Sequence, residues 1–136
     1  MKLAALICVG LAAAAAAAAS AVSAQADCAP PPAGAAQVAG VGVQAAWQAV
    51  PAPIAVGRPF ALLVSLCPVQ AQLLRVDATM PEHRHGMNYR PTLQDLGGGR
   101  WRVEGLLWHM SGRWELRMDV SLQDQTQVLR HSVTLP

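Results

Sequence analysis

Histidine and methionine occur close together in this chain, and four of the eight that follow the N-terminal Met1 fall within one short segment. Residues 80–87 read MPEHRHGM, and the pair His109-Met110 follows at some distance. Imidazole nitrogen and thioether sulfur are both metal ligands, and the soft sulfur favours Cu(I) over hard ions such as Mg²⁺ or Ca²⁺. The chemistry best suited to these residues is therefore copper binding.

The spacing of the donors fits a shared site. His83 and His85 are two residues apart, so in extended backbone both side chains face the same way. A third nitrogen from His109, or sulfur from Met87 or Met110, would complete three or four ligands. Zinc sites are built mainly from Cys, His and carboxylate, so a mixed His/Met set favours copper.

Several neighbouring residues have simpler interpretations. Glu82 is either an oxygen ligand or an acceptor that fixes a histidine tautomer. Met80 alternates in step with Leu74 and Val76, so we expect these side chains to face the core, and we expect Met118 to be buried on the same argument. His131 is expected at a strand edge and not as a ligand. The histidines of the loop could also be ordinary surface residues beside Arg84 and Arg90.

Seven segments show the alternation or apolar runs of short strands between turns. They are 41–47, 60–67, 74–80, 92–96, 100–109, 114–120 and 128–135. About seven strands with period-two patterning predict an all-β fold, an antiparallel immunoglobulin-like β-sandwich.

The tryptophans are expected in the core or at its rim, except for Trp108, whose side chain should point to the opposite face of its strand from that of Trp101. We therefore expect Trp108 on the surface, where it would mark a contact patch.

This strand order brings the two histidine segments to the same end of the sandwich. Antiparallel strands reverse direction at each turn, so the loop 81–91 and the turn 110–112 both follow strands that run the same way. The same counting puts Cys67 at the opposite end. We therefore expect His83, His85 and His109 to converge, far from the cysteines.

The N-terminus has the features of a targeting signal. Lys2 precedes an apolar run dominated by alanine, and small residues at 22–24 predict cleavage before Gln25, which makes 1–24 a signal peptide. A membrane anchor is the alternative, but the run is short and alanine is weakly apolar. No lipobox precedes Cys28. Residues 25–36 then form an extended Pro-rich leader, and 37–136 form the sandwich domain.

Two cysteines remain once the signal is removed. In an exported protein, Cys28 and Cys67 most simply form one disulfide. A thiolate metal site is the alternative, but there is no CxxC spacing. Beyond the predicted signal, the chain carries nine arginines, no lysine and eight acidic residues. This near-neutral balance gives no reason to expect binding to nucleic acid or to an anionic membrane surface.

The chain lacks the residue patterns of common enzymes. It has no Ser-His-Asp pattern, no glycine-rich phosphate loop and no HExxH motif, and nothing supplies a nucleophile beside the histidines. We therefore expect no catalytic activity.

The two histidine segments also carry a family resemblance. Residues 76–91, VDATMPEHRHGMNYRP, and 105–116, GLLWHMSGRWEL, resemble the YtkA-like family of exported bacterial immunoglobulin-like proteins, which is related to FixH-type domains. The similarity covers roughly 41–136. It implies a periplasmic or cell-surface β-sandwich, and some family members occur in contexts that suggest copper handling or respiratory-complex assembly. There is a looser likeness to periplasmic copper chaperones with two His and two Met ligands, but the spacing here differs.

Two functions follow as hypotheses. The first is a non-catalytic periplasmic or secreted copper-binding or delivery protein, with His83, His85 and His109 as ligands and Met87 and Met110 as soft partners. It would exchange metal with a periplasmic or inner-membrane acceptor protein. The second is a metal-free interaction module of an envelope or respiratory-complex assembly, which contacts its partner through Tyr89 and Trp108.

Overall fold

A computed structural model describes residues 27–136, and the ordered elements in this range are all β-strands. The signal peptide and its cleavage site, predicted for 1–24, lie outside the described residues. The strands are β1 (Ala36–Ala39), β2 (Gln44–Val50), β3 (Pro59–Cys67), β4 (Gln72–Met80), β5 (His85–Gly86), β6 (Thr92–Gly97), β7 (Arg100–Leu107), β8 (Gly112–Leu122) and β9 (Gln125–Leu135). The described chain contains no helix long and apolar enough to cross a membrane.

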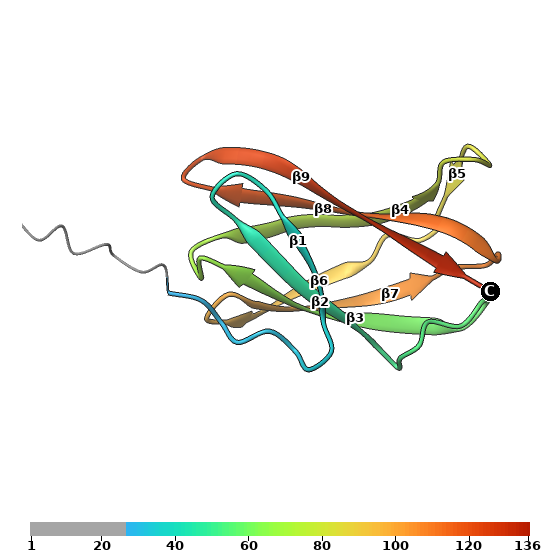
Figure 1. Cartoon of the computed structure of the whole chain (residues 1–136), viewed down its shortest axis with the longest axis horizontal. Coiled ribbons are helices and arrows are strands. Elements are labelled where there is room, and N and C mark those ends of the chain that lie inside the picture. Colours follow the sequence, from blue (N-terminus) through green and yellow to red (C-terminus); the bar gives the residue numbers. More distant parts are fainter. Residues whose placement is uncertain (1–26) are drawn as a thin grey trace, which may run out of the picture.

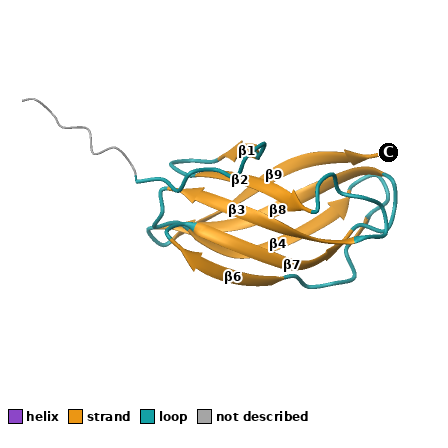
Figure 2. Ribbon diagram, turned by 90° about the horizontal axis from the view of Figure 1, so that it is seen from below, coloured by secondary structure: helices purple, strands orange, loops and turns teal. Residues whose placement is uncertain are grey.

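The strands form two antiparallel sheets packed face to face (Figures 1 and 2). One sheet has the order β1-β2-β3-β7-β6, and the other has the order β5-β4-β8-β9. The predicted β-sandwich is therefore confirmed. The two strands that the sequence patterns did not indicate are the four-residue β1, at the end of the predicted leader, and the two-residue β5.

Alternating side chains of the two sheets fill the space between them. On β8, Trp114, Leu116, Met118 and Val120 are all fully buried, and the residues between them are only partly covered. On β4, Met80 is buried as well, so the predictions for Met80 and Met118 are confirmed. Burial of these side chains removes apolar surface from water and is the main force that holds the sheets together.

One prediction from parity fails on β4, where Leu74 was expected to face the core with Val76. Leu73 pairs with Val120 and Arg75 pairs with Asp119, so β4 has one residue more than β8 over this interval. This β-bulge turns Leu74 outward, with 51% of its surface exposed, and Leu73 is buried in its place.

A second bulge corrects the prediction for Trp108. Phe60 pairs with Leu106 and Leu62 pairs with Val103, so β7 has one residue more than β3. Gly105 lies in this interval with φ of +85°, a left-handed conformation that glycine adopts readily. The extra residue reverses the parity beyond it, and Trp108 is therefore 0% exposed instead of lying on the surface.

The loops gather at two opposite ends of the sandwich. One end, called the histidine end below, carries the β2–β3 loop (51–58), the β4–β5 turn (81–84) and the β7–β8 loop (108–111). The other, the disulfide end, carries the β3–β4, β6–β7 and β8–β9 turns and residue Cys67. Figure 1 shows the β4–β5 hairpin and the first described residues at opposite extremities of the molecule.

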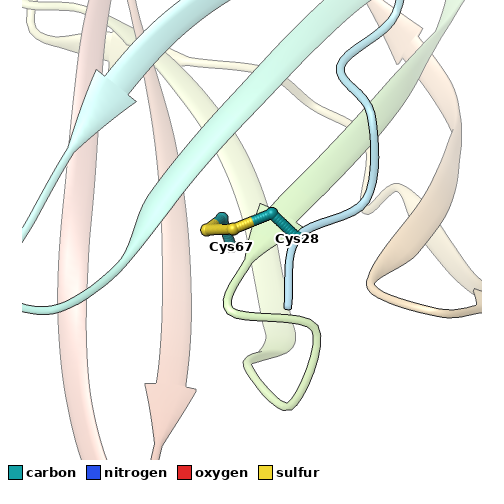
Figure 3. The surroundings of a disulfide bond; sticks show 2 residues. All are labelled: Cys28 and Cys67. Carbon is teal, nitrogen blue, oxygen red and sulfur yellow. A yellow bond between two sulfur atoms is a disulfide. The ribbon is translucent and has the colours of Figure 1, made fainter. Parts of the chain in front are cut away.

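A disulfide joins Cys28 to Cys67, as the sequence predicted (Figure 3). Their Cα atoms are 4.6 Å apart, and the residues are separated by 39 positions in the chain. The backbone NH of Val69 also donates to the carbonyl of Asp27 at 2.9 Å. The disulfide therefore anchors the segment that precedes β1 to the end of β3.

Candidate metal centre at the histidine end

A tight hairpin positions His83 and His85. β4 ends at Met80, which pairs with His85 across the turn 81–84. The NH of His83 donates to the carbonyl of Met80 at 3.1 Å, and the NH of Met87 donates to the carbonyl of Ala78 at 3.1 Å. These backbone bonds hold both imidazoles beside the end of β4.

The loop 108–111 positions His109 through two tryptophans. Trp108 and Trp114 stack in the core, with ring centroids 5.3 Å apart and planes inclined by 6°. The indole NH of Trp114 donates to the carbonyl of Met110 at 3.0 Å, which ties the loop to β8. His109 is exposed, and its ring meets the Trp114 ring at 5.6 Å with planes inclined by 79°.

The three histidines converge as the strand order predicted. The His83 and His85 centroids are 5.7 Å apart, and those of His85 and His109 are 5.3 Å apart. With metal–nitrogen bonds of about 2.0–2.1 Å, two imidazoles on one ion have centroids roughly 5–6 Å apart. Both neighbouring pairs therefore stand at separations that one metal ion can span, with His85 as the member common to both.

His85 has an unusual environment for a histidine near the surface. Its Nε2 atom is buried and has no hydrogen-bond partner among the described residues. Its ring also lies 6.5 Å from the ring of Trp114. A buried polar atom without a partner has lost its hydration without replacement, which costs free energy, and a bound metal ion would supply the missing partner.

The two methionines proposed as sulfur ligands lie against the hydrophobic core. Met87 and Met110 are partly buried and pack against the hydrophobic core. Each is next to the histidine segments in the chain, but the structure gives no sulfur–nitrogen contact that would define a joint ligand set. Between residues 27 and 136, no three His, Cys, Asp or Glu side chains form a group that could hold a metal ion. Nitrogen and oxygen donors alone therefore do not make a preformed site.

Glu82 has a different partner from the histidines. Its Oε1 accepts a hydrogen bond from Nε of Arg113 at 2.7 Å, and the two form an ion pair. This hydrogen bond lowers the pKa of Glu82 below its usual value, and the backbone of Glu82 adds to the effect. The contact links the turn 81–84 to the start of β8, so the carboxylate fastens the histidine turn.

Trp114 is the residue of this site whose place the sequence did not reveal. Its alternation with Leu116 and Met118 indicated only core packing, and the core position is correct. The structure adds that the Trp114 ring lies beside the rings of both His85 and His109. His131 lies elsewhere, on the edge strand β9, partly buried with its ring 5.4 Å from that of Trp47, in agreement with the position expected for it.

Comparisons of this chain with protein-family models, with curated proteins and with solved structures find no match.

Proposed function

We propose that this protein binds copper at the histidine end as a non-catalytic, periplasmic or secreted accessory or delivery protein. The observation that carries the proposal is the position of the His85 ring beside the imidazoles of both His83 and His109, together with its buried Nε2, which has no hydrogen-bond partner among the described residues. Assignment to the YtkA-like family belongs to the same proposal, because the two segments that resemble it are those that form this end. Export is supported by the disulfide, which persists in oxidising compartments.

The donor set favours the cuprous ion. His85 would be the fixed ligand, with His109 or His83 as a second nitrogen, and sulfur from Met87 or Met110 would supply the soft ligand that distinguishes Cu(I) from harder ions. Because His83 and His109 are both exposed, a bound ion would remain within reach of ligands from an acceptor protein. Exchange of ligands at an open site is what delivery requires.

The test is Cu(I) affinity, measured anaerobically by competition with bicinchoninate. Loss of a supporting residue around a metal typically costs about 10–100-fold in affinity, so loss of a direct ligand in His85→Ala should cost more than this. His131→Ala removes an imidazole far from the site and is the matched control, with unchanged affinity expected. Met87→Leu and Met110→Leu conserve volume and test the sulfur donors.

Two results would contradict the proposal. Equal Cu(I) affinity in the unmodified protein, His85→Ala and the double variant His83→Ala/His85→Ala would remove the histidine turn from the site. A metal that binds with the same affinity after both methionine substitutions would contradict the role of sulfur.

A metal-free interaction module is the second candidate. It is favoured by the lack of a preformed group of nitrogen and oxygen donors in residues 27–136 and by Tyr89, which is 53% exposed on the connection between β5 and β6. Trp108 no longer supports this function, because it is buried. The same titration separates the two functions, since a module of this kind would show no difference between His85→Ala and His131→Ala.

A further inference from the structure

Trp114 belongs both to the hydrophobic core and to the surroundings of the candidate metal centre. Its side chain is fully buried, and its ring centroid lies 6.5 Å from that of His85 and 5.6 Å from that of His109. An ion bound by both imidazoles would lie about 3 Å from each imidazole centroid, and therefore about 4–7 Å from the indole centroid. The indole is thus a near neighbour of any ion that these two histidines share.

The indole offers such an ion no ligand atom. Its Nε1 carries a hydrogen and acts only as a donor, and it donates to the carbonyl oxygen of Met110 at 3.0 Å. The ring of Trp108, which is also fully buried, stacks on the ring of Trp114 and holds it in the core. On the side of Trp114, the ion would therefore meet a fixed apolar ring, and the Met110 carbonyl next to His109 is already engaged.

An apolar neighbour of this kind affects the two oxidation states of copper differently. The free-energy cost of placing an ion in apolar surroundings rises with its charge, so Cu(II) is disfavoured more than Cu(I). Cu(II) also prefers a square-planar or tetragonal set of nitrogen and oxygen ligands, which the indole side of the site does not supply. We propose that Trp114 makes the histidine end selective for Cu(I) over Cu(II), an inference that rests on the proposed function. It acts by keeping water and oxygen ligands away from the buried side of the ion.

Trp114→Phe is the variant that tests this role. The smaller ring leaves space beside His85 and His109, and the loss of the indole NH releases the carbonyl oxygen of Met110. Because both changes let oxygen ligands approach the ion, Cu(I) affinity should fall relative to Cu(II) affinity. We expect the ratio of the two affinities to drop at least about tenfold, which corresponds to a reduction potential about 59 mV lower. Cu(I) affinity is measured anaerobically against bicinchoninate, and Cu(II) affinity against glycine.

The matched control is Trp101→Phe, the same exchange at the other end of the sandwich. Trp101 is also buried, its Nε1 has no hydrogen-bond partner among residues 27–136, and it lies at the start of β7 next to the β6–β7 turn. This variant should also lose stability, since a smaller ring leaves a cavity, but its ratio of Cu(I) to Cu(II) affinity should be unchanged. All proteins are compared at a temperature at which circular dichroism shows them folded. An equal change of the ratio in both variants would overturn the inference.

A second measurement needs no substitution in the core. Silver nitrate supplies Ag(I), a soft monovalent ion, to the ¹⁵N-labelled unmodified protein, and the indole NH signals are followed by NMR. Bound Ag(I) should shift the Trp114 signal and leave the Trp101 signal in place, and the opposite pattern would overturn the inference.

The copper titrations separate this inference from the proposed function. Copper binding that depends on His85, combined with an unchanged affinity ratio in Trp114→Phe, would overturn the role of Trp114 and leave the proposed function standing. Equal Cu(I) affinity in the unmodified protein and in His85→Ala would instead refute the proposed function.

Discussion

At the residue scale, His85 decides what the histidine end can do. Its neighbours His83 and His109 are exposed, whereas the Nε2 of His85 is buried without a hydrogen-bond partner among the described residues. The indole nitrogens of Trp47, Trp101 and Trp108 share this state, but unlike them an imidazole nitrogen can bind a metal ion. The cost of leaving this nitrogen without a partner is of the order of 1–3 kcal/mol. A bound metal ion would give the nitrogen a partner and remove this cost. Copper binding would then stabilise the β4–β5 hairpin.

Arg84 gives a prediction at the same scale. Replacement by glycine should relieve the strain of the left-handed backbone, offset in part by the greater freedom of glycine in the unfolded chain. We expect Arg84→Gly to raise the free energy of unfolding by about 0.5–1 kcal/mol in urea denaturation. Arg84→Ala keeps a Cβ atom and serves as the control, with no gain. A gain of the same size in both variants would show that removal of the charge is the cause.

At the element scale, two β-bulges decide which residues of β4 and β7 face the core. Strict alternation correctly places Val103 and Trp101 inside, but the extra residue near Gly105 reverses the pattern before Trp108. Trp108 then stacks on Trp114, and His109 emerges beside the other histidines. The bulge in β7 therefore helps to determine the position of His109.

Gly105→Ala tests this role. A Cβ atom added at this position would have room, because the nearest heavy atom, Cα of Pro91, would be 3.9 Å away. The loss of stability would therefore come from the positive φ alone. We expect a loss of about 1–2 kcal/mol in the free energy of unfolding. Tryptophan emission should shift to the red if the bulge closes and Trp108 turns outward. Glu104→Ala, at the neighbouring exposed position, should change stability by less than about 0.5–1 kcal/mol. A similar loss in both variants would argue against the backbone explanation.

At the scale of the whole molecule, the sandwich separates the disulfide end from the histidine end, where we propose the copper site. The disulfide closes a long loop at one end, and His83, His85, His109 and Trp114 lie together at the other. The two ends are connected by rigid antiparallel strands. Changes at the disulfide should therefore act on the stability of the fold without direct effect on the metal ligands.

The double variant Cys28→Ser/Cys67→Ser tests that separation. Loss of a cross-link that spans 39 positions should lower the free energy of unfolding by up to about 4 kcal/mol, by the loop-entropy estimate. Cu(I) affinity, measured under conditions in which the variant is folded by circular dichroism, should match that of the unmodified protein. A folded variant with greatly weakened copper binding would contradict the independence of the two ends.

The sequence by itself determined the β-sandwich, the disulfide partners and the end at which the histidine segments meet. Each of these follows from local rules: alternation sets a strand, two cysteines allow one pairing, and antiparallel connection fixes the end to which a loop belongs. Met80 and Met118 were placed in the core for the same reason.

Only the tertiary structure decided which face several residues occupy and what their polar atoms contact. A bulge is a mismatch between two paired strands, so the pattern of one strand alone could not place Leu74 or Trp108. The pairing of Glu82 with Arg113 and the burial of His85 Nε2 likewise depend on residues brought together from separate elements.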